Sequence, residues 1–289
     1  MKIKGFIITG IILTILGVGA TAIASTQLDF QEGFAGVFAD PNLEKKEETF
    51  GEIHKIVYDG KDENIDIIYS EGENTFTYYE SDTLTYDISY DEELKELTIH
   101  QNHMFTFFNF SFINKKATLT VNSSLEELQM KAAAGNIGIK DLEIQKANVD
   151  VSAGNLKIEN SIIPILDLES AAGNVNLHDL TVDSSKLDVK AGNLKIEDSK
   201  IVNATIHANA GNVNLKDTHF DSVEAKLNAG NLTFYGDILI HADFKLDAGN
   251  LKLTLARPQT SYTINGEGEG DTTILYKVSA GNKKIYYAD

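Results

Sequence analysis

Five side chains that carry oxygen recur at a constant spacing of 19 residues in the middle of the chain: Asp141, Asn160, Asp179, Asp198 and Asp217. If successive segments stack as parallel strands, these oxygens lie about 4.8 Å apart, and Ca²⁺ accepts carboxylate and carbonyl oxygens as ligands. The same residue types also favour turns, because their side chains hydrogen-bond their own backbone. The glycine-rich nonapeptide of calcium-loaded β-rolls is missing. We therefore expect turn residues and no cofactor, with weak calcium binding as the alternative.

The remaining candidates for chemistry do not form a catalytic or metal constellation. Histidines within the repeat fall at four different offsets and cannot stack, and His100-x-x-His103 has no third ligand nearby. The chain has no Cys, which excludes disulfides and thiolate chemistry. Solenoid enzymes that act on polysaccharides need carboxylates converging on a groove built by long loops, whereas these repeats carry no insertions. We predict that the protein is not an enzyme and assign no catalytic, cofactor-binding or metal-binding residue.

The spacing belongs to a repeat of an Ala-Gly-Asn triplet that returns seven times without a slip. Its glycines and asparagines are Gly135 and Asn136, Gly154 and Asn155, Gly173 and Asn174, Gly192 and Asn193, Gly211 and Asn212, Gly230 and Asn231, and Gly249 and Asn250. Alternating aliphatic residues follow each triplet. A second apolar column lies eight residues after the Asn: Ile144, Ile163, Val182, Ile201, Phe220 and Leu239.

This pattern predicts an all-β fold, a single-stranded parallel β-helix (β-solenoid) with 19-residue coils. One coil cannot bury its aliphatic face alone, but stacked coils fill a continuous core in fixed register. Gly turns a corner at positive φ without a Cβ penalty, and stacked Asn amides hydrogen-bond along a ladder. The alternative is that the exposed amide row recognises sugars.

An eighth triplet, Ala280-Gly281-Asn282, lies 32 residues beyond the seventh. The extra residues include the glycine-rich stretch Asn265–Asp271, which we interpret as a loop inserted near the C-terminal cap. Terminal coils are commonly atypical because their open edge must be covered.

Four regions are predicted along the chain: a transmembrane signal-anchor at 1–24, a spacer at 25–48, a strand-rich lead-in and N-terminal cap at 49–117, and the solenoid with its C-terminal cap at 118–289. The run from Gly5 to Ala24 is uncharged and long enough for a bilayer. Lys2 and Lys4 precede it, which places the C-terminal domain outside a single-pass cell membrane protein. Cleavage after Ala24 and secretion is the alternative.

The lead-in contains short alternating runs, such as Ile53–Tyr58 and Ile65–Tyr69, which indicate strands. Asp59-Gly60, Glu71-Gly72 and Asp91-Glu92 are predicted turns between them.

Five phenylalanines crowd into one stretch after the lead-in: Phe105, Phe107, Phe108, Phe110 and Phe112. They predict either a strand that caps the solenoid or an exposed interaction patch for lipid or a partner protein.

The formal net charge is −18, with 25 basic and 43 acidic residues. That balance argues against nucleic acid as a partner, because phosphate affinity needs clustered Lys and Arg.

The order of these features resembles a known family. The chain has an N-terminal anchor, then the segment Ala117-Thr118-Leu119-Thr120-Val121, and then Leu128-Gln129-Met130 leading into the Ala-Gly-Asn repeats. This order is similar to the bacterial "putative adhesin" domain of unknown function, including LiaG-like membrane-anchored envelope proteins. Asn122 stands where that family often has Pro. The resemblance implies a β-helical extracellular domain and a link to the cell-envelope stress response, and it carries no catalytic residues.

Together these observations predict a non-enzymatic, membrane-anchored extracytoplasmic β-solenoid that binds an envelope component or a partner protein. The alternatives are an enzyme that acts on polysaccharide from a β-helix and a purely structural surface spacer.

Overall fold

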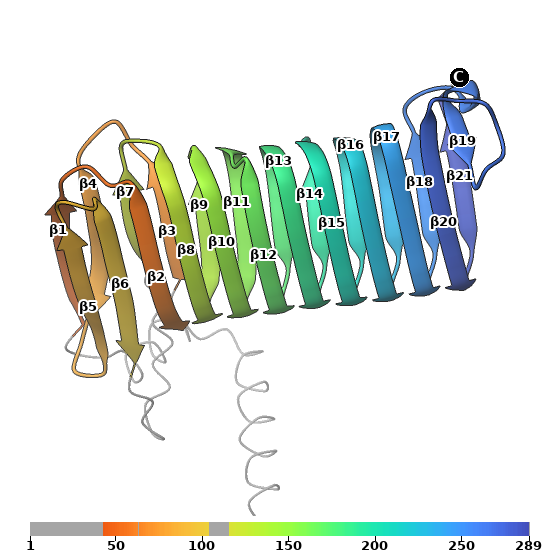
Figure 1. Cartoon of the computed structure of the whole chain (residues 1–289). Helices are drawn as coiled ribbons and strands as arrows, with labels where there is room; N and C mark the ends of the chain where they lie inside the picture. The colour runs from red at the N-terminus through yellow and green to blue at the C-terminus, as the bar shows by residue number, and fades with distance from the viewer. Residues whose placement is uncertain (1–42, 63, 104–115, 289) are drawn as a thin grey trace, which may run out of the picture. The chain divides into compact units, whose positions relative to one another are not determined.

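The computed structural model describes residues 43–62, 64–103 and 116–288, which form an all-β structure (Figure 1). The N-terminal strands are β1 (Glu44–Phe50), β2 (Lys55–Asp62), β3 (Asn64–Tyr69), β4 (Asn74–Glu80), β5 (Leu84–Asp91), β6 (Glu96–His103) and β7 (Lys116–Val121). The repeats contain β8 (Leu125–Ala134), β9 (Asn136–Lys140), β10 (Ile144–Ala153), β11 (Asn155–Ile162), β12 (Ile165–Ala172), β13 (Val175–Ala191), β14 (Leu194–Glu197), β15 (Lys200–Ala210), β16 (Val213–Ala229), β17 (Leu232–Ala248) and β18 (Leu251–Leu255). The C-terminal part adds the short 3₁₀ helix η1 (Gln259–Ser261), β19 (Tyr262–Ile264), β20 (Thr272–Ala280) and β21 (Lys283–Tyr287).

The predicted all-β class is confirmed. No helix within the described ranges is long and apolar enough to cross a bilayer. The predicted anchor at 1–24 and the phenylalanine stretch Phe105–Phe112 both lie outside those ranges.

Each 19-residue coil places one strand on each of two faces, and coils pair in parallel with their neighbours. On the first face, β8 pairs with β10 and β10 with β12, so that Met130, Val149 and Leu168 stand in register. On the second face, β9 pairs with β11 and β11 with β13. The long strands β13, β16 and β17 start on the second face and end on the first. Figure 1 shows the resulting row of strands side by side.

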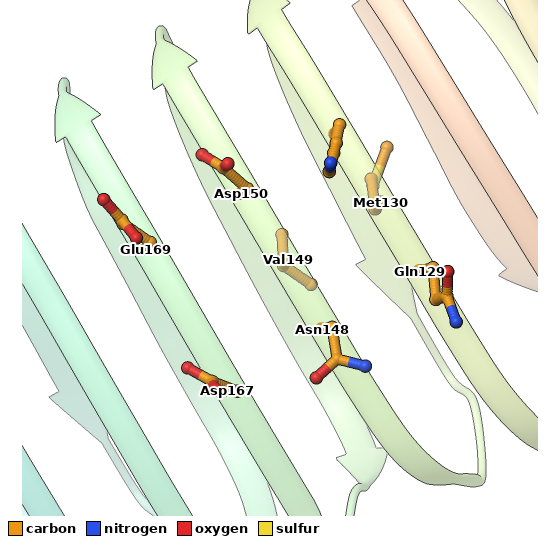
Figure 2. A pocket seen from close by; sticks show the side chains of 8 residues that line it. Gln129, Met130, Asn148, Val149, Asp150, Asp167 and Glu169 are labelled. Carbon is orange, nitrogen blue, oxygen red and sulfur yellow. The ribbon is translucent and has the colours of Figure 1, made fainter.

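Successive side chains along each strand point alternately into the core and toward solvent. On the first face, Met130 and Val149 point inward and are buried, whereas their neighbours Gln129 and Asn148 face outward (Figure 2). The aliphatic residues after each triplet are likewise buried, as Ile137, Ile139, Leu194 and Ile196 show. One cluster of buried apolar side chains runs from the lead-in to the last coil. This continuity is the reason that a coil is stable only in the stack.

The second apolar column is buried as predicted except at Leu239, where the prediction is wrong. Leu239 is 48% exposed and Ile238, at 0%, occupies the core position instead. The register explains the exchange, because Lys216 pairs with Tyr235 but Thr218 pairs with Gly236. The coil thus loses one residue at that turn, and it regains one after Ile238, since Ser222 pairs with His241.

The stack begins earlier than the triplets indicate. β2 pairs in parallel with β8, and β3 pairs with β9, so residues 55–69 form a coil directly beside the first triplet coil. The turn predicted at Asp59-Gly60 is wrong, because both residues lie inside β2. A Cβ on Gly60 would lie 2.6 Å from the Tyr58 ring, so glycine here makes room for a buried aromatic side chain. β1 also begins at Glu44, inside the predicted spacer.

Antiparallel strands cover the N-terminal end of the stack. β6 and β7 form the outermost parallel coil, against β2 and β3 respectively. β5 then pairs antiparallel with β6, while β4 pairs antiparallel with both β7 and β1. Phe76, Tyr78 and Tyr86 pack together in this region, with ring centroids 4.7–5.6 Å apart. The coil edge is therefore paired at this end.

The C-terminal end is built differently. β20 and β21 pair in parallel with β17 and β18, so the eighth triplet stacks on the seventh across the 32-residue gap. Residues 256–271 form the insertion, including η1, β19 and the turn at Asn265 and Gly266. The predicted loop within Asn265–Asp271 is thus confirmed.

The triplet corner brings two backbones into contact. Gly192 has φ +139°, and a Cβ there would lie 1.7 Å from the carbonyl oxygen of Gly173 in the preceding coil. The other triplet glycines also have positive φ, and those from Gly154 onward make the same close approach. Alanine would meet both a backbone conformation that L residues avoid and a hard clash.

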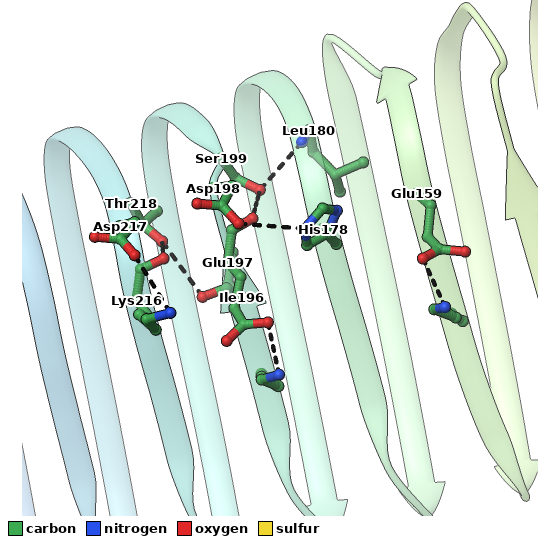
Figure 3. Close-up of polar contacts among 12 residues, drawn as sticks. Glu159, His178, Leu180, Ile196, Glu197, Asp198, Ser199, Lys216, Asp217 and Thr218 are labelled. Atoms are coloured by element: carbon green, nitrogen blue, oxygen red, sulfur yellow. Dashed lines mark hydrogen bonds and ion pairs between the residues drawn. The ribbon is translucent and has the colours of Figure 1, made fainter.

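On the outer side of the second face, lysines and glutamates pair (Figure 3). Glu159 accepts from Lys157 at 2.6 Å and lies 3.3 Å from Lys140, and Lys195 pairs with Glu197 at 2.6 Å. The hydrogen bond from Lys157 holds the pKa of Glu159 below its ordinary value of 4.5. Charges of opposite sign therefore offset each other along this face.

Substitution Gly192→Ala is expected to destabilise the stack by at least about 2 kcal/mol, because strain at positive φ adds to the clash. Thermal unfolding followed by circular dichroism measures the loss. Gly72→Ala is the matched control, since its Cβ would meet only the Ser70 hydroxyl at 3.7 Å. Equal midpoints for the two variants would show that the corner tolerates a side chain.

The ion pairs of Glu159 predict that the stability of the fold decreases in acid. Its lowered pKa means that ionised Glu159 stabilises the fold above pH 4.5, and that this contribution is lost as pH falls through the lowered value. Glu159→Gln should lower the unfolding midpoint at pH 7, and the difference from wild type should vanish in acid. Glu71→Gln, in an exposed bend, should match wild type throughout. A difference between Glu159→Gln and wild type that does not change with pH would contradict this account.

Candidate functional site

The asparagine ladder uses its own polar atoms. Asn193 donates to Oδ1 of Asn174 from both its backbone N–H (3.3 Å) and its side-chain Nδ2 (3.0 Å). Corresponding side-chain bonds of 2.8–3.3 Å link Asn64, Asn136, Asn155, Asn174, Asn193, Asn212, Asn231, Asn250 and Asn282. A carbonyl oxygen has two lone pairs, and both are used where two donors converge. The ladder therefore has little acceptor capacity left for a sugar.

The 19-residue column of Asp and Asn residues forms turns. Asp141, Asn160, Asp179, Asp198 and Asp217 all have left-handed backbone conformations, with φ between 47° and 59°. Asp and Asn tolerate this conformation better than other non-glycine residues. Asp198 lies 3.2 Å from His178 and Asp217 lies 3.5 Å from Lys216 (Figure 3). In the described part of the chain, no group of three or more His, Cys, Asp or Glu side chains is placed to hold a metal ion.

The first face carries a shallow acidic hollow of about 300 Å³, which sequence reasoning did not single out. Asp150, Asp167 and Glu169 point outward around it, on β10 and β12 (Figure 2). Lys190 forms an ion pair with Glu169 and lowers the pKa of that carboxyl. All lining residues come from strands β8, β10 and β12, so no loop builds a wall around it. The hollow is part of a flat sheet surface.

A larger cavity of about 900 Å³ lies at the C-terminal end of the stack. The inserted segment 259–269 forms one side, and the terminal strands β20 and β21 form the other. Tyr276, Ile285 and Tyr287 supply apolar surface, and Glu267 and Glu269 supply carboxylates.

Within the described residues no further coil packs on β20 and β21, and the cavity lies against them. Tyr276, Val278, Ile285 and Tyr287 are only partly buried against the core. Their counterparts one coil earlier are fully buried: Phe244, Leu246, Leu253 and Leu255. The inward face of the terminal coil is therefore accessible, and two of its four side chains have become tyrosines.

Hydrogen bonds hold the inserted segment in place. Arg257 donates to Asp237 and to the Thr272 hydroxyl, both at 2.8 Å, and its guanidinium lies 5.0 Å from the centre of the Tyr262 ring. Asn265 accepts from the backbone N–H of Tyr276 at 2.9 Å and donates to its carbonyl oxygen. These contacts tie the inserted segment to β17 and β20.

Sequence reasoning located the insertion but missed Tyr276 and Tyr287. The available signal was the change from Phe244 and Leu255 to tyrosine at the matching positions of the last repeat. The interaction patch predicted at Phe105–Phe112 lies outside the described residues.

Comparisons with known proteins agree with this architecture. A putative adhesin from Bacteroides fragilis is similar in structure, with a TM-score of 0.51 and 18% identity, over 84% of this chain and 97% of that one. A putative lipid binding protein from Parabacteroides distasonis has a TM-score of 0.50 and 15% identity, over 85% of this chain and 98% of that one. Similarity at such identities shows the fold alone.

No curated protein sequence matches the chain. The Toastrack DUF4097 family matches residues 53–285, and this match confirms the resemblance inferred from the repeat. Because it spans most of the sequence, the chain belongs to the Toastrack DUF4097 family.

Proposed function

We propose that the protein is a non-enzymatic, membrane-anchored β-solenoid that binds a component of the cell envelope through the terminal coil. The observation that carries this proposal is the cavity of about 900 Å³ at the C-terminal end. The names of the two structural neighbours, a putative adhesin and a putative lipid binding protein, accord with a binding role.

The two ends of the stack favour different roles. Antiparallel strands pair the outermost coil at the N-terminal end, which is a structural closure. At the other end, apolar side chains stay partly exposed beside carboxylates and amides. Concave sites that combine apolar walls with a few polar groups are the usual form of a ligand site. A spacer would need no such cavity.

The sequence supports display outside the cell. Lys2 and Lys4 precede the uncharged run Gly5–Ala24, which has the length and flanking charge of a membrane anchor. The link to envelope stress comes from the resemblance to LiaG-like proteins and remains part of the proposal.

An enzyme acting on polysaccharide is the second candidate, and one observation bears on it. Asp150, Asp167 and Glu169 gather on the first face, but strands alone surround them. A glycosidase positions its acid and its nucleophile or base on either side of a bound sugar, and a flat sheet does not enclose one. The terminal cavity therefore supports binding better than the acidic hollow supports hydrolysis.

The binding role predicts that full-length protein, kept in solution by neutral detergent, co-sediments with bacterial envelopes from which detergent has removed the membrane, so that the N-terminal anchor contributes no retention. Replacing Tyr276 and Tyr287 with Ala should abolish retention, because both side chains line the cavity. Tyr235→Ala is the control, since Tyr235 is exposed on the second face away from the cavity. Phe107→Ser with Phe110→Ser tests the aromatic stretch. If only that variant loses retention, the terminal cavity is not the binding surface.

The anchor predicts that the full chain stays in the membrane pellet after an alkaline wash, with residues 25–289 digested by protease added to intact protoplasts. Mass spectrometry of the N-terminal peptide distinguishes the alternative. A mature chain that begins at Ser25 and appears in the medium would replace anchoring by cleavage and secretion.

A further inference from the structure

The terminal cavity has two kinds of surface that face one another. Tyr276, Ile285 and Tyr287, on the strands, form the floor, and the Lys283 ammonium lies 4.6 Å from the centre of the Tyr276 ring. Glu267 and Glu269 lie on the exposed loop opposite. Burial raises the pKa of Tyr287 further above its ordinary value of 10, and its hydroxyl is protonated at neutral pH. A ligand that fits this cavity must therefore present an apolar surface on one side and hydrogen-bonding groups on the other.

Backbone pairing with an extended peptide is disfavoured at this edge. The Asn265 side chain already pairs with both the N–H and the carbonyl of Tyr276, which an added strand would need. Lys277 projects from β20, and Lys283 and Lys284 project from β21. Lysine on an edge strand is a usual protection against strand addition. These groups therefore disfavour the addition of a strand to the terminal coil, while the cavity beside it remains accessible.

The charge of the cavity disfavours anionic ligands. Within the described residues neither Glu267 nor Glu269 belongs to an ion pair, so both carboxylates are available. Lys283 is the basic residue of the lining, and its ammonium donates to the Tyr276 hydroxyl at 2.7 Å. Two carboxylates and one engaged ammonium would repel phosphate polymers and anionic headgroups.

We propose that the terminal cavity binds neutral pyranose units of an envelope oligosaccharide. The flat C–H face of a pyranose packs on tyrosine rings, while its ring of hydroxyls donates to carboxylate and amide oxygens. Tyr276 and Tyr287 provide the rings, and Glu267 and Glu269 the acceptors. A volume of about 900 Å³ falls within the usual range for ligand sites. This inference rests on the proposed binding function and names its ligand class.

This assignment is tested by isothermal titration calorimetry, in which full-length protein in neutral detergent is titrated with cellohexaose, chitohexaose and maltohexaose. At least one hexaose should bind, and Tyr276→Ala should weaken binding by about tenfold, the effect of losing one aromatic stacking contact. Glu267→Gln keeps the size of the side chain and leaves the core untouched, and it should weaken binding about threefold or more. Tyr235→Ala should bind as wild type does. Long-chain polyphosphate, phosphatidylglycerol vesicles and an octapeptide of alternating Val and Thr are the competing ligands.

The outcomes separate this inference from the proposed function. If no hexaose binds but envelope retention still depends on Tyr276 and Tyr287, the saccharide assignment is wrong and the binding role stands. Binding of polyphosphate, vesicles or the peptide that is lost in Glu267→Gln or Tyr276→Ala would also overturn the assignment. If neither hexaose binding nor envelope retention responds to the cavity variants, both proposals fail.

Discussion

The structure depends on a close backbone approach at one corner of every coil. At Gly192 a single added carbon would lie 1.7 Å from the carbonyl oxygen of Gly173, so the two chains touch there without side chains between them. This contact is compatible with the spacing that parallel backbone pairing sets between coils, and the Asn amides beside it bond from coil to coil, as Asn193 does to Asn174. Because a one-residue slip would turn the aliphatic set outward, the corner and the core specify the same register.

Because this register is periodic, most of the fold could be predicted from the sequence, and the failures are local breaks in the period. Leu239 has the right spacing for the core, but a deletion at the turn before it and an insertion after Ile238 move it to the surface. Asp59 and Gly60 are residue types that favour turns, yet both lie inside a strand, where Gly60 leaves space for the Tyr58 ring. The coil at 55–69 has no Ala-Gly before Asn64, so the triplet could not reveal it. In the first two cases tertiary packing overrides a local signal, and in the third the signal is absent.

The candidate site was harder to predict because its side chains occupy ordinary repeat positions and differ only in their exposure. Tyr276 and Tyr287 occupy inward positions, where any earlier coil would bury them. Among the described residues no coil stacks on theirs, so both side chains stay partly exposed, and residue type alone does not reveal this. The insertion at Asn265–Asp271 was visible as an irregular spacing, but its pairing with Tyr276 through Asn265 required the structure.

The faces of the stack largely satisfy their own polar groups, which is why the proposed binding surface lies at an end. On the second face Glu159 and Glu197 meet lysines, and in the ladder each amide oxygen serves the next coil. A repeat that meets its own hydrogen-bonding and charge requirements offers few unsatisfied groups to a ligand. In the described residues no coil stacks on the terminal one, and its inward side chains stay partly exposed. The N-terminal end has been closed with antiparallel strands. The partly covered C-terminal end, with tyrosines where the repeat has Phe244 and Leu255, is where selection for binding would act.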